Sequence, residues 1–196
     1  MARRKIQFEI ENFYHIFNRG NRKQRIFFED ENYKYFLRQL HKYFNPMGIE
    51  VISYCLMPNH FHLIIYLTRE TDFSSIMRRF SISYTRSLNR WIDSAGHVFQ
   101  GNFGAQQIDE AAYLTHVFRY VHLNPVLAKL VTLPNEWQYS DYSVWVNPAA
   151  SKELPSIRMR DEYFTGASDY KSFVLDYWKD KETENRLFKK FKFLEC

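Results

Sequence analysis

Residues 49–67, IEVISYCLMPNHFHLIIYL, contain two apolar runs separated by a Pro-Asn pair. Both runs (49–57 and 61–67) are rich in β-branched and aromatic residues, a composition typical of β-strands. A break this short favours two antiparallel strands joined by a tight connection. The stretch therefore predicts a β-hairpin, with His60 and His62 at the start of its second strand.

The sequence before the hairpin predicts a strand, a basic loop and a helix. Residues 12–17 (NFYHIF) are rich in aromatic side chains and favour a strand, and the polar NRGNRKQR that follows is a turn with a strong positive charge. Over residues 30–44 the apolar side chains have the spacing of one helical face. They are Tyr33, Phe36, Leu37, Leu40 and Phe44. The segment NPMG then ends the helix.

The sequence after the hairpin predicts a second long helix, a last strand and a third helix. Residues 72–92 have apolar side chains at helical intervals with arginines largely between them. Residues 98–108 contain two glycines and favour a bent or bulged strand. Asp109 is a good N-cap for a helix reaching about residue 123, because Pro125 disfavours helical geometry at the residue before it.

The resulting order, β-α-β-β-α-β, predicts the α+β class. We expect a ferredoxin-like or RRM-like antiparallel sheet with helices packed on one face. The length of 196 residues favours one domain with an appendage. We place the domain at residues 1–146 and a mostly helical C-terminal extension at 147–196, with a helix at about 168–178.

Composition excludes several classes of protein. A hydrophobic content of 45% and an aromatic content of 18% indicate a folded chain. No apolar run approaches the roughly 20 residues that a membrane span needs, and the N-terminus does not read as a signal segment, so we expect a cytoplasmic protein. Cys55 and Cys196 are too few for a disulfide framework and lack metal-ligand spacing. The net charge of +5 permits a polyanionic partner.

His60 and His62 are the first candidate chemical site. Because side chains alternate along a strand, both histidines emerge on the same face, where two imidazoles can bind one divalent ion. From spacing alone, the alternative of two partly exposed histidines at the start of a strand stays open. None of the other histidines has a comparably persuasive pairing. These are His15, His41, His97, His116 and His122.

Tyr120 and Asn124 are the second candidate site. They are four residues apart, so on a helix they lie one turn from each other on the same side. A phenol is a weak nucleophile at neutral pH and needs a nearby cation to attack a phosphate. The residues alone favour the simpler alternative, in which Tyr120 packs in the core and Asn124 caps the helix.

Several motifs together change that balance. Met-Pro-Asn-His-Phe-His at 57–62, followed about sixty residues later by Tyr-Val-His-Leu-Asn-Pro-Val at 120–126, resembles the single-tyrosine HUH endonucleases, specifically the REP-associated tyrosine transposases. The likeness covers about residues 10–146. It extends to the motifs HIFNRG with RIF, VFQGNF, and WQYS with Tyr142.

The resemblance implies a role for each matching residue. His60 and His62 match the HUH pair and would bind Mg²⁺ or Mn²⁺, Asn124 matches the third ligand, and Tyr120 matches the nucleophile. The implied enzyme nicks single-stranded or hairpin DNA, forms a 5′-phosphotyrosine link, and rejoins strands without ATP or another nucleotide cofactor. Relatives of this kind act as monomers or homodimers, and the sequence leaves this chain's oligomeric state and target DNA open.

Two departures from the family pattern concern DNA contacts. Family members often carry a basic residue after Asn-Pro-Val, where this chain has Leu127. They also often carry one near 103–105, which here reads Phe-Gly-Ala.

Basic residues of the first loop and of the second long helix are candidates for phosphate contact. In the loop they are Arg19, Arg22, Lys23 and Arg25, and in the helix Arg78, Arg79, Arg86 and Arg90. The alternative is an ordinary solvated surface, with some helix arginines supporting packing. Two other functions also stay open: a hairpin-DNA-binding protein that has lost cleavage, and a metal-dependent phosphodiester hydrolase that uses water.

Overall fold

The computed structural model describes residues 6–176, which form two compact units. The division falls between Asp109 and Glu110, so the described part of the first unit is residues 6–109 and that of the second is residues 110–176. The domain boundary expected at residue 146 therefore lies inside the second unit. None of the helices in the described part of the chain is long and apolar enough to cross a membrane.

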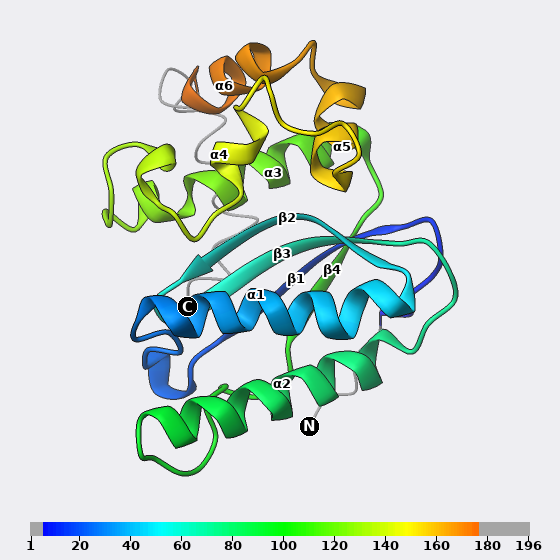
Figure 1. The fold of residues 1–196 in the computed structure, drawn as a ribbon. Helices are drawn as coiled ribbons and strands as arrows, with labels where there is room; N and C mark the ends of the chain where they lie inside the picture. Colours follow the sequence, from blue (N-terminus) through cyan, green and yellow to red (C-terminus); the bar gives the residue numbers. More distant parts are fainter. Residues whose placement is uncertain (1–5, 177–196) are drawn as a thin grey trace. The chain divides into compact units, whose positions relative to one another are not determined.

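The first unit is built on a four-stranded antiparallel sheet (Figure 1). Its strands are β1 (Phe13–Arg19), β2 (Ile49–Met57), β3 (His60–Leu67) and β4 (Gly104–Ile108). They lie in the order β2-β3-β1-β4, and each neighbouring pair is antiparallel. The hairpin expected at residues 49–67 is β2 and β3, so the fold class inferred from the sequence is confirmed.

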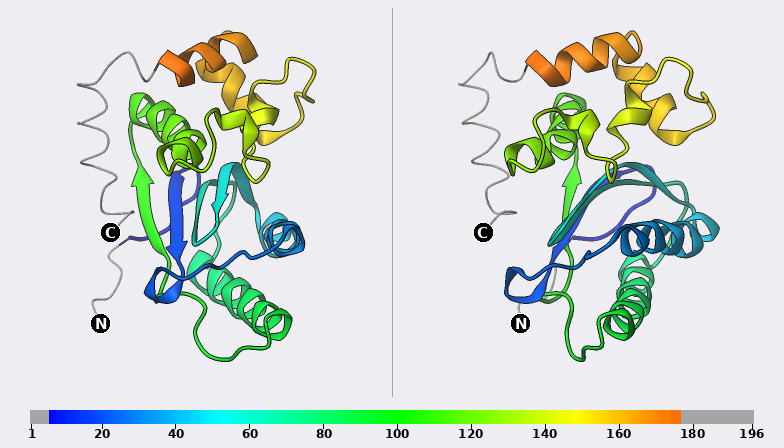
Figure 2. Two further views of the ribbon diagram at one scale, coloured as in Figure 1. Left: turned by 90° about the vertical axis from the view of Figure 1, so that its left-hand side faces the viewer. Right: turned by 60° about the vertical axis from the view of Figure 1, so that its left-hand side comes forward.

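Two helices cover one face of this sheet. They are α1 (Asp30–Phe44) and α2 (Phe73–Trp91), and Figure 2 shows both on the same side of the strands. Asp72 caps α2 by accepting a hydrogen bond from the Ser75 backbone N–H at 3.0 Å. α1 is followed by a short 3₁₀ turn that ends at Gly48, whose φ of 67° favours glycine.

Aromatic side chains form the core between the helices and the sheet. The ring of Phe36 on α1 lies 5.0 Å from that of Phe61 on β3 and 4.9 Å from that of Phe80 on α2. All three side chains are fully buried. Because Phe61 lies between His60 and His62 on β3, its inward direction sends both histidines to the other face of the sheet.

The strand register fixes the composition of that other face, which we call the histidine face. β1 pairs with β3 so that Phe17 lies opposite His62 and Arg19 opposite His60. Residues directly opposite each other on antiparallel strands point to the same side. The histidine face therefore carries His60, His62, Phe17, Arg19 and, two residues before Phe17, His15.

The last strand is shorter than the sequence predicted. Ladder pairing covers only Gly104–Ile108, and within 98–103 the single bridge joins Phe99 to Gly20. Gly104 permits close packing on β1, because a Cβ there would lie 2.1 Å from the Phe17 ring. The sequence predicted one bent strand over residues 98–108. In the structure, residues 98–103 form a loop and the strand begins at Gly104.

The second unit is helical in the part that the structure describes. Its helices are α3 (Ala111–Leu127), α4 (Tyr142–Trp145), α5 (Pro155–Tyr163) and α6 (Ala167–Leu175), with a 3₁₀ turn at Pro134–Glu136. The helix expected at 168–178 is α6, and residues 177–196 of the predicted extension lie outside the described residues.

Two expectations for α3 are wrong. Its N-cap is Glu110, not Asp109, and the helix does not end at Pro125 but continues to Leu127. Pro125 removes one N–H near the end of the helix, yet the Asn124 and Pro125 carbonyls accept from Ala128 and Leu130, each at 2.9 Å. The helix continues through the half-buried Val126 and Leu127, because Pro125 removes only one N–H and because Asn124 and Pro125 are themselves buried.

Removal of the Phe36 ring tests the aromatic core. Phe36→Ala leaves a cavity among Phe27, Phe61, Phe80 and Tyr84, so we expect it to lower the free energy of unfolding by about 3–5 kcal/mol. Urea unfolding followed by circular dichroism measures the change. Ile82→Ala on the exposed side of α2 is the control and should shift stability by no more than about 0.5 kcal/mol. Equal effects of the two substitutions would contradict this description of the core.

Candidate active site and nucleic-acid interface

His60 and His62 lie side by side on the histidine face, as the sequence predicted. Their ring centroids are 5.0 Å apart, with the planes nearly perpendicular. His62 is buried, with 1% of its surface exposed, whereas His60 is half-buried. β3 holds both, because its alternation buries Phe61 and Leu63 against the helices.

Each histidine of the pair has a polar contact at its Nδ1 atom. His60 Nδ1 lies 2.7 Å from Asn59 Oδ1. His62 Nδ1 lies 3.0 Å from His15 Nε2, and these two rings stack with centroids 5.1 Å apart. No local pattern linked His15 to another histidine, since 47 residues separate it from His62. The β1-β3 register brings the two together.

Burial keeps His15 and His62 neutral. Desolvation lowers the pKa of His15 to about 3. Desolvation also lowers the pKa of His62 well below its ordinary value, with smaller contributions from His60 and His15. Neutral imidazole is the form that binds metal ions, so burial keeps His62 in the charge state that metal binding requires.

The first basic loop is bound to the turn that precedes His60. The Gly20 N–H donates to the Asn59 carbonyl at 2.8 Å, and Asn59 Nδ2 donates to the Lys23 carbonyl at 3.3 Å. The N–H groups of Ile26 and Phe27 donate to the Pro58 carbonyl. The predicted DNA-binding loop therefore lies beside the histidine pair.

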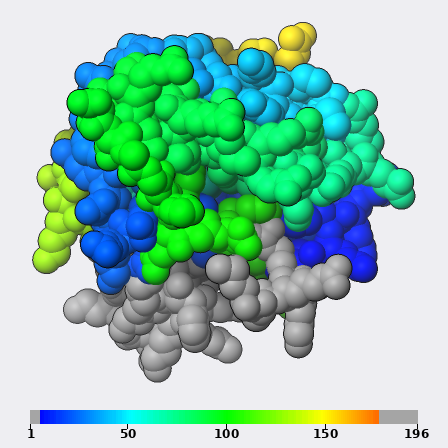
Figure 3. Space-filling view, turned by 90° about the horizontal axis from the view of Figure 1, so that it is seen from below, coloured from blue at the N-terminus to red at the C-terminus, as the bar shows by residue number. Residues whose placement is uncertain are grey.

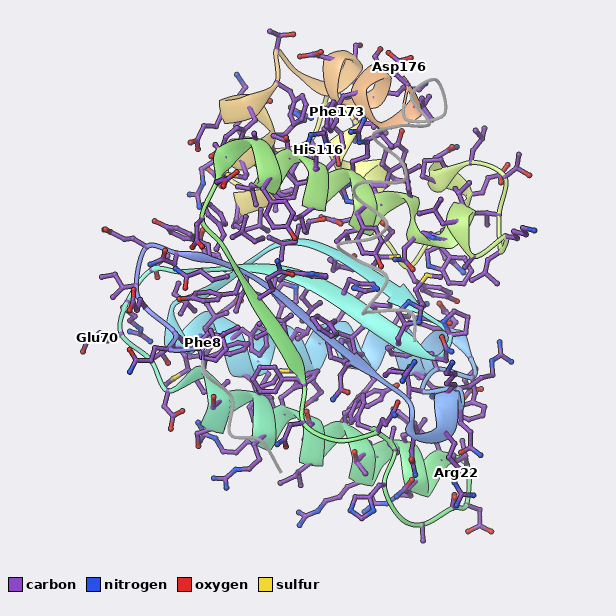
Figure 4. All side chains as sticks on the ribbon, turned by 180° about the vertical axis from the view of Figure 1, so that it is seen from behind. Phe8, Arg22, Glu70, His116, Phe173 and Asp176 are labelled. Atoms are coloured by element: carbon purple, nitrogen blue, oxygen red, sulfur yellow. The ribbon has the colours of Figure 1, made fainter. Side chains whose placement is uncertain are left out.

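The charged side chains of this loop point outward. Arg22, Lys23 and Arg25 are exposed, and Figure 4 shows Arg22 extending from the loop. Arg22 and Lys23 both have positive φ values, 53° and 61°, which the hydrogen bonds to the β2-β3 turn hold in place.

Arg19 is held differently from the loop side chains. Its Nε donates to Gln100 Oε1 at 2.7 Å, and it lies opposite His60 in the strand register. Gln100 is a residue that sequence reasoning missed as a support for the site. The VFQGNF motif contained it, but no local pattern linked it to Arg19.

The arginines of α2 form a separate group. Arg78, Arg79, Arg86 and Arg90 are all exposed, on the helix layer that covers the face opposite the histidines. Figure 3 looks onto this side of the molecule. The second half of α2 packs next to the basic loop, because Tyr84 donates to the Ile26 carbonyl at 2.6 Å. Arg86 and Arg90 therefore belong to the half of α2 that lies next to the loop, whereas Arg78 and Arg79 belong to the other half.

Tyr120 and Asn124 lie in the second unit, one turn apart on α3. Both are buried, with 6% and 3% of their surfaces exposed. Their helix is buried along most of its C-terminal half, residues 117–125. A buried tyrosine fits the core-packing alternative as well as a nucleophile that is shielded from water.

A polar network fixes α3 within the second unit. His122 is fully buried, with Nε2 2.9 Å from Asp141 Oδ1 and Nδ1 2.5 Å from the Tyr170 hydroxyl. The other Asp141 oxygen accepts from the Trp145 indole at 2.8 Å. The network joins α3 to α4 and α6. Sequence reasoning missed it, because His122 showed no partner nearby in the sequence.

A second group ties the same helix to α6. The Arg119 guanidinium lies 4.1 Å from the Phe173 ring centroid and donates to the Phe173 carbonyl at 3.2 Å. Arg119 also lies 2.7 Å from His116 Nδ1, and Figure 4 shows His116 and Phe173 on facing helices. The helix that carries Tyr120 is thus anchored by Arg119, one residue before the tyrosine, and by His122, two residues after it.

Comparison with known proteins gives a family and a fold. The model of the family described as IS200-like transposases matches residues 10–124. A search of curated proteins gives no match.

Among solved structures, a REP-associated tyrosine transposase bound to a REP hairpin is similar, with a TM-score of 0.66 and 19% sequence identity. The match covers 77% of this chain and 88% of that one, which establishes a shared fold. A candidate transposase from Deinococcus radiodurans R1 matches with a TM-score of 0.42 and 13% identity, over 61% of this chain and 95% of that one.

The buried neutral histidines predict acid sensitivity of the metal-free protein. The pKa of His15 is lower in the folded state than the ordinary value near 6.5 in the unfolded state. The folded protein therefore binds fewer protons, and stability is lost as pH falls from about 6.5 toward about 3. We expect a loss of up to about 1.4 kcal/mol per pH unit for each such imidazole.

Urea unfolding in EDTA at a series of pH values from 7.5 to 5 measures this loss. His15→Gln removes one of the titrating groups and should give a shallower dependence, while His41→Gln on the exposed side of α1 should not. An unchanged slope in His15→Gln would show that His15 is not held neutral by burial.

Proposed function

Because the chain belongs to the family of IS200-like transposases, we propose that it is a metal-dependent endonuclease and strand transferase acting on single-stranded or hairpin DNA. The pairing of His60 and His62 on one sheet face, with both Nδ1 atoms in polar contacts, is the observation that carries this proposal. The fold shared with a transposase bound to a REP hairpin supports hairpin DNA as the substrate class.

The histidine face fits a divalent ion. The polar contacts of His60 and His62 are at Nδ1, so each histidine can offer its Nε2 atom to a metal ion. Burial favours the neutral form of His62. Within residues 6–176, no group of three or more His, Cys, Asp or Glu side chains could hold a metal ion. We assign the role of third ligand to the amide oxygen of Asn124, the residue at the position of the third ligand in the family pattern. When bound, Mg²⁺ or Mn²⁺ supplies Lewis-acid polarisation of a non-bridging oxygen of the scissile phosphate.

Tyr120 is the proposed nucleophile. Its phenolic oxygen forms a bond to phosphorus while the bond to the 3′-oxygen breaks, and the leaving strand takes up a proton as a 3′-hydroxyl. The product is a 5′-phosphotyrosine. A 3′-hydroxyl can attack this link in the reverse reaction and release Tyr120, so the bond energy is conserved and no nucleotide cofactor is required.

The remaining groups bind DNA in this proposal. Arg19, held by Gln100 beside His60, is suited to a phosphate near the cleavage point. The exposed cations of the loop at residues 22–25 are suited to the flanking backbone.

Loss of the phenol tests the chemistry. Wild-type protein incubated with labelled hairpin DNA and Mn²⁺ should form a covalent adduct visible on a denaturing gel. Tyr120→Phe should reduce adduct formation at least about 100-fold, because it removes the attacking atom. Tyr113→Phe on the same helix is the matched control and should retain the adduct.

The alternatives give different outcomes in the same assay. Cleavage without an adduct that survives in Tyr120→Phe would indicate a hydrolase that uses water. Tight hairpin binding that is insensitive to EDTA, with no cleavage, would indicate a binding protein that has lost its activity. Either result contradicts the proposal.

The position of the loop predicts its contribution to DNA affinity. The triple substitution Arg22→Gln, Lys23→Gln and Arg25→Gln should weaken hairpin binding, because fewer phosphates are neutralised by the protein. The dependence of log K on log salt should fall by about 0.7–0.9 for each phosphate that is no longer neutralised. Fluorescence anisotropy at several salt concentrations measures both quantities.

Arg78→Gln with Arg79→Gln is the matched comparison, because these residues lie on the helix layer of the opposite face. This double variant should change the salt dependence less than the loop variant does. An equal or larger effect would assign the DNA interface to α2 instead.

A further inference from the structure

The two histidines of the pair each meet a different polar neighbour, and we propose that Asn59 and His15 are positioning residues that hold His60 and His62 in the tautomer whose Nε2 binds the metal ion. Both would act through the ligands and not on the ion. The assignment rests on the proposed function and adds a supporting layer to that site.

For His60 the contact with Asn59 determines the tautomer. Asn59 Nδ2 donates to the Lys23 carbonyl at 3.3 Å, so the Asn59 Oδ1 atom is the one that faces His60. An amide oxygen only accepts hydrogen bonds, and the 2.7 Å contact therefore requires a proton on His60 Nδ1. In this neutral tautomer the lone pair is on Nε2, which is the atom a metal ion takes.

For His62 the contact with His15 allows two arrangements. If His15 Nε2 donates, His62 Nδ1 accepts and the proton of neutral His62 lies on Nε2, which then cannot bind a metal. If His62 Nδ1 donates, His15 Nε2 accepts and the His62 lone pair lies on Nε2. Only the second arrangement makes His62 a metal ligand through Nε2, and it gives both histidines of the pair the same tautomer.

The packing around His15 suits this role. His15 has 1% of its surface exposed and stacks on His62 at an interplanar angle of 25°. It also lies against Phe17, with ring centroids 5.3 Å apart. These contacts restrict the ring, so the 3.0 Å contact between its Nε2 and His62 Nδ1 is a fixed feature of the sheet. Hydrogen bonds to the second ring nitrogen commonly set the orientation and tautomer of histidine ligands.

Asn59 also connects the metal pair to the basic loop. Its side chain donates to the Lys23 carbonyl, and its own carbonyl accepts from the Gly20 N–H. A change in the loop on binding DNA can therefore reach His60 through one residue. Asn59 directly precedes His60 in the MPNHFH motif. An asparagine suits this position because its amide can accept from His60 and donate to the Lys23 carbonyl at the same time.

Mn²⁺ affinity tests the proposal in the full chain. The free aquo-Mn²⁺ signal in electron paramagnetic resonance gives the dissociation constant without any reaction. His15→Phe fills the same space without an acceptor, and Asn59→Leu removes the amide. We expect each to weaken Mn²⁺ binding about 10–100-fold. His15→Gln and Asn59→Asp keep an acceptor near the same place and should retain most of the affinity.

His41→Phe is the control, because His41 contacts Asn45 on the exposed side of α1 and has no role in the site. It should bind Mn²⁺ as wild type does. Circular dichroism of each variant shows whether the fold is kept.

The tautomers of His60 and His62 in the wild-type protein can be observed directly. A purely structural role of Asn59 and His15 would not fix these tautomers. Two-bond nitrogen–proton correlation spectra of ¹⁵N-histidine-labelled, metal-free protein distinguish the two neutral forms, and His60→Gln and His62→Gln spectra assign the signals. We expect both residues of the pair as Nδ1–H tautomers. Observation of His62 protonated on Nε2 would overturn the proposal even if His15→Phe does not fold.

Failure of this proposal can be told apart from failure of the proposed function. Wild-type protein that binds Mn²⁺ through His60 and His62, with equal affinity in His15→Phe and Asn59→Leu, contradicts the positioning role alone. Wild-type protein that does not bind Mn²⁺ contradicts both.

Discussion

The register of β1 against β3 is the constraint on which the histidine face depends. It places Phe17 opposite His62 and Arg19 opposite His60, and it brings His15 within 3.0 Å of His62. A shift of one residue in either strand would turn these side chains into the aromatic core beneath the sheet. The burial of Phe61 and Leu63 on the helix side therefore stabilises the position of the histidines, although neither apolar residue has a chemical role.

In the second unit, contacts between helices fix the position of the candidate residues on α3. α3 carries Tyr120 and Asn124 one turn apart, and the His122–Asp141–Tyr170 network and the Arg119–Phe173 contact bind that helix to α4 and α6. Buried polar networks of this kind are costly unless all their members are paired, and when paired they favour one packing over others. The C-terminal helices thus give α3 a defined position within its unit.

Local patterns were sufficient to predict the hairpin, the order of elements and the same-face position of His60 and His62, because alternation along a strand is a property of neighbouring residues. They were not sufficient for His15 or His122. The partners of these residues lie 47 and 19 or more positions away, and only the sheet register and the helix packing bring them close. Pro125 shows the same limit, since the local preference of proline to end a helix does not stop α3, which continues to Leu127.

The central claim is that two imidazoles of one sheet face hold a divalent ion. Pulsed electron paramagnetic resonance of the Mn²⁺-loaded full chain tests it most directly, because nitrogen atoms bound to Mn²⁺ modulate the spin echo. We expect modulation from two imidazole nitrogens in wild type, from one in either His60→Ala or His62→Ala, and from none in the double variant. Modulation that is absent in wild type, or unchanged in the double variant, would contradict the claim.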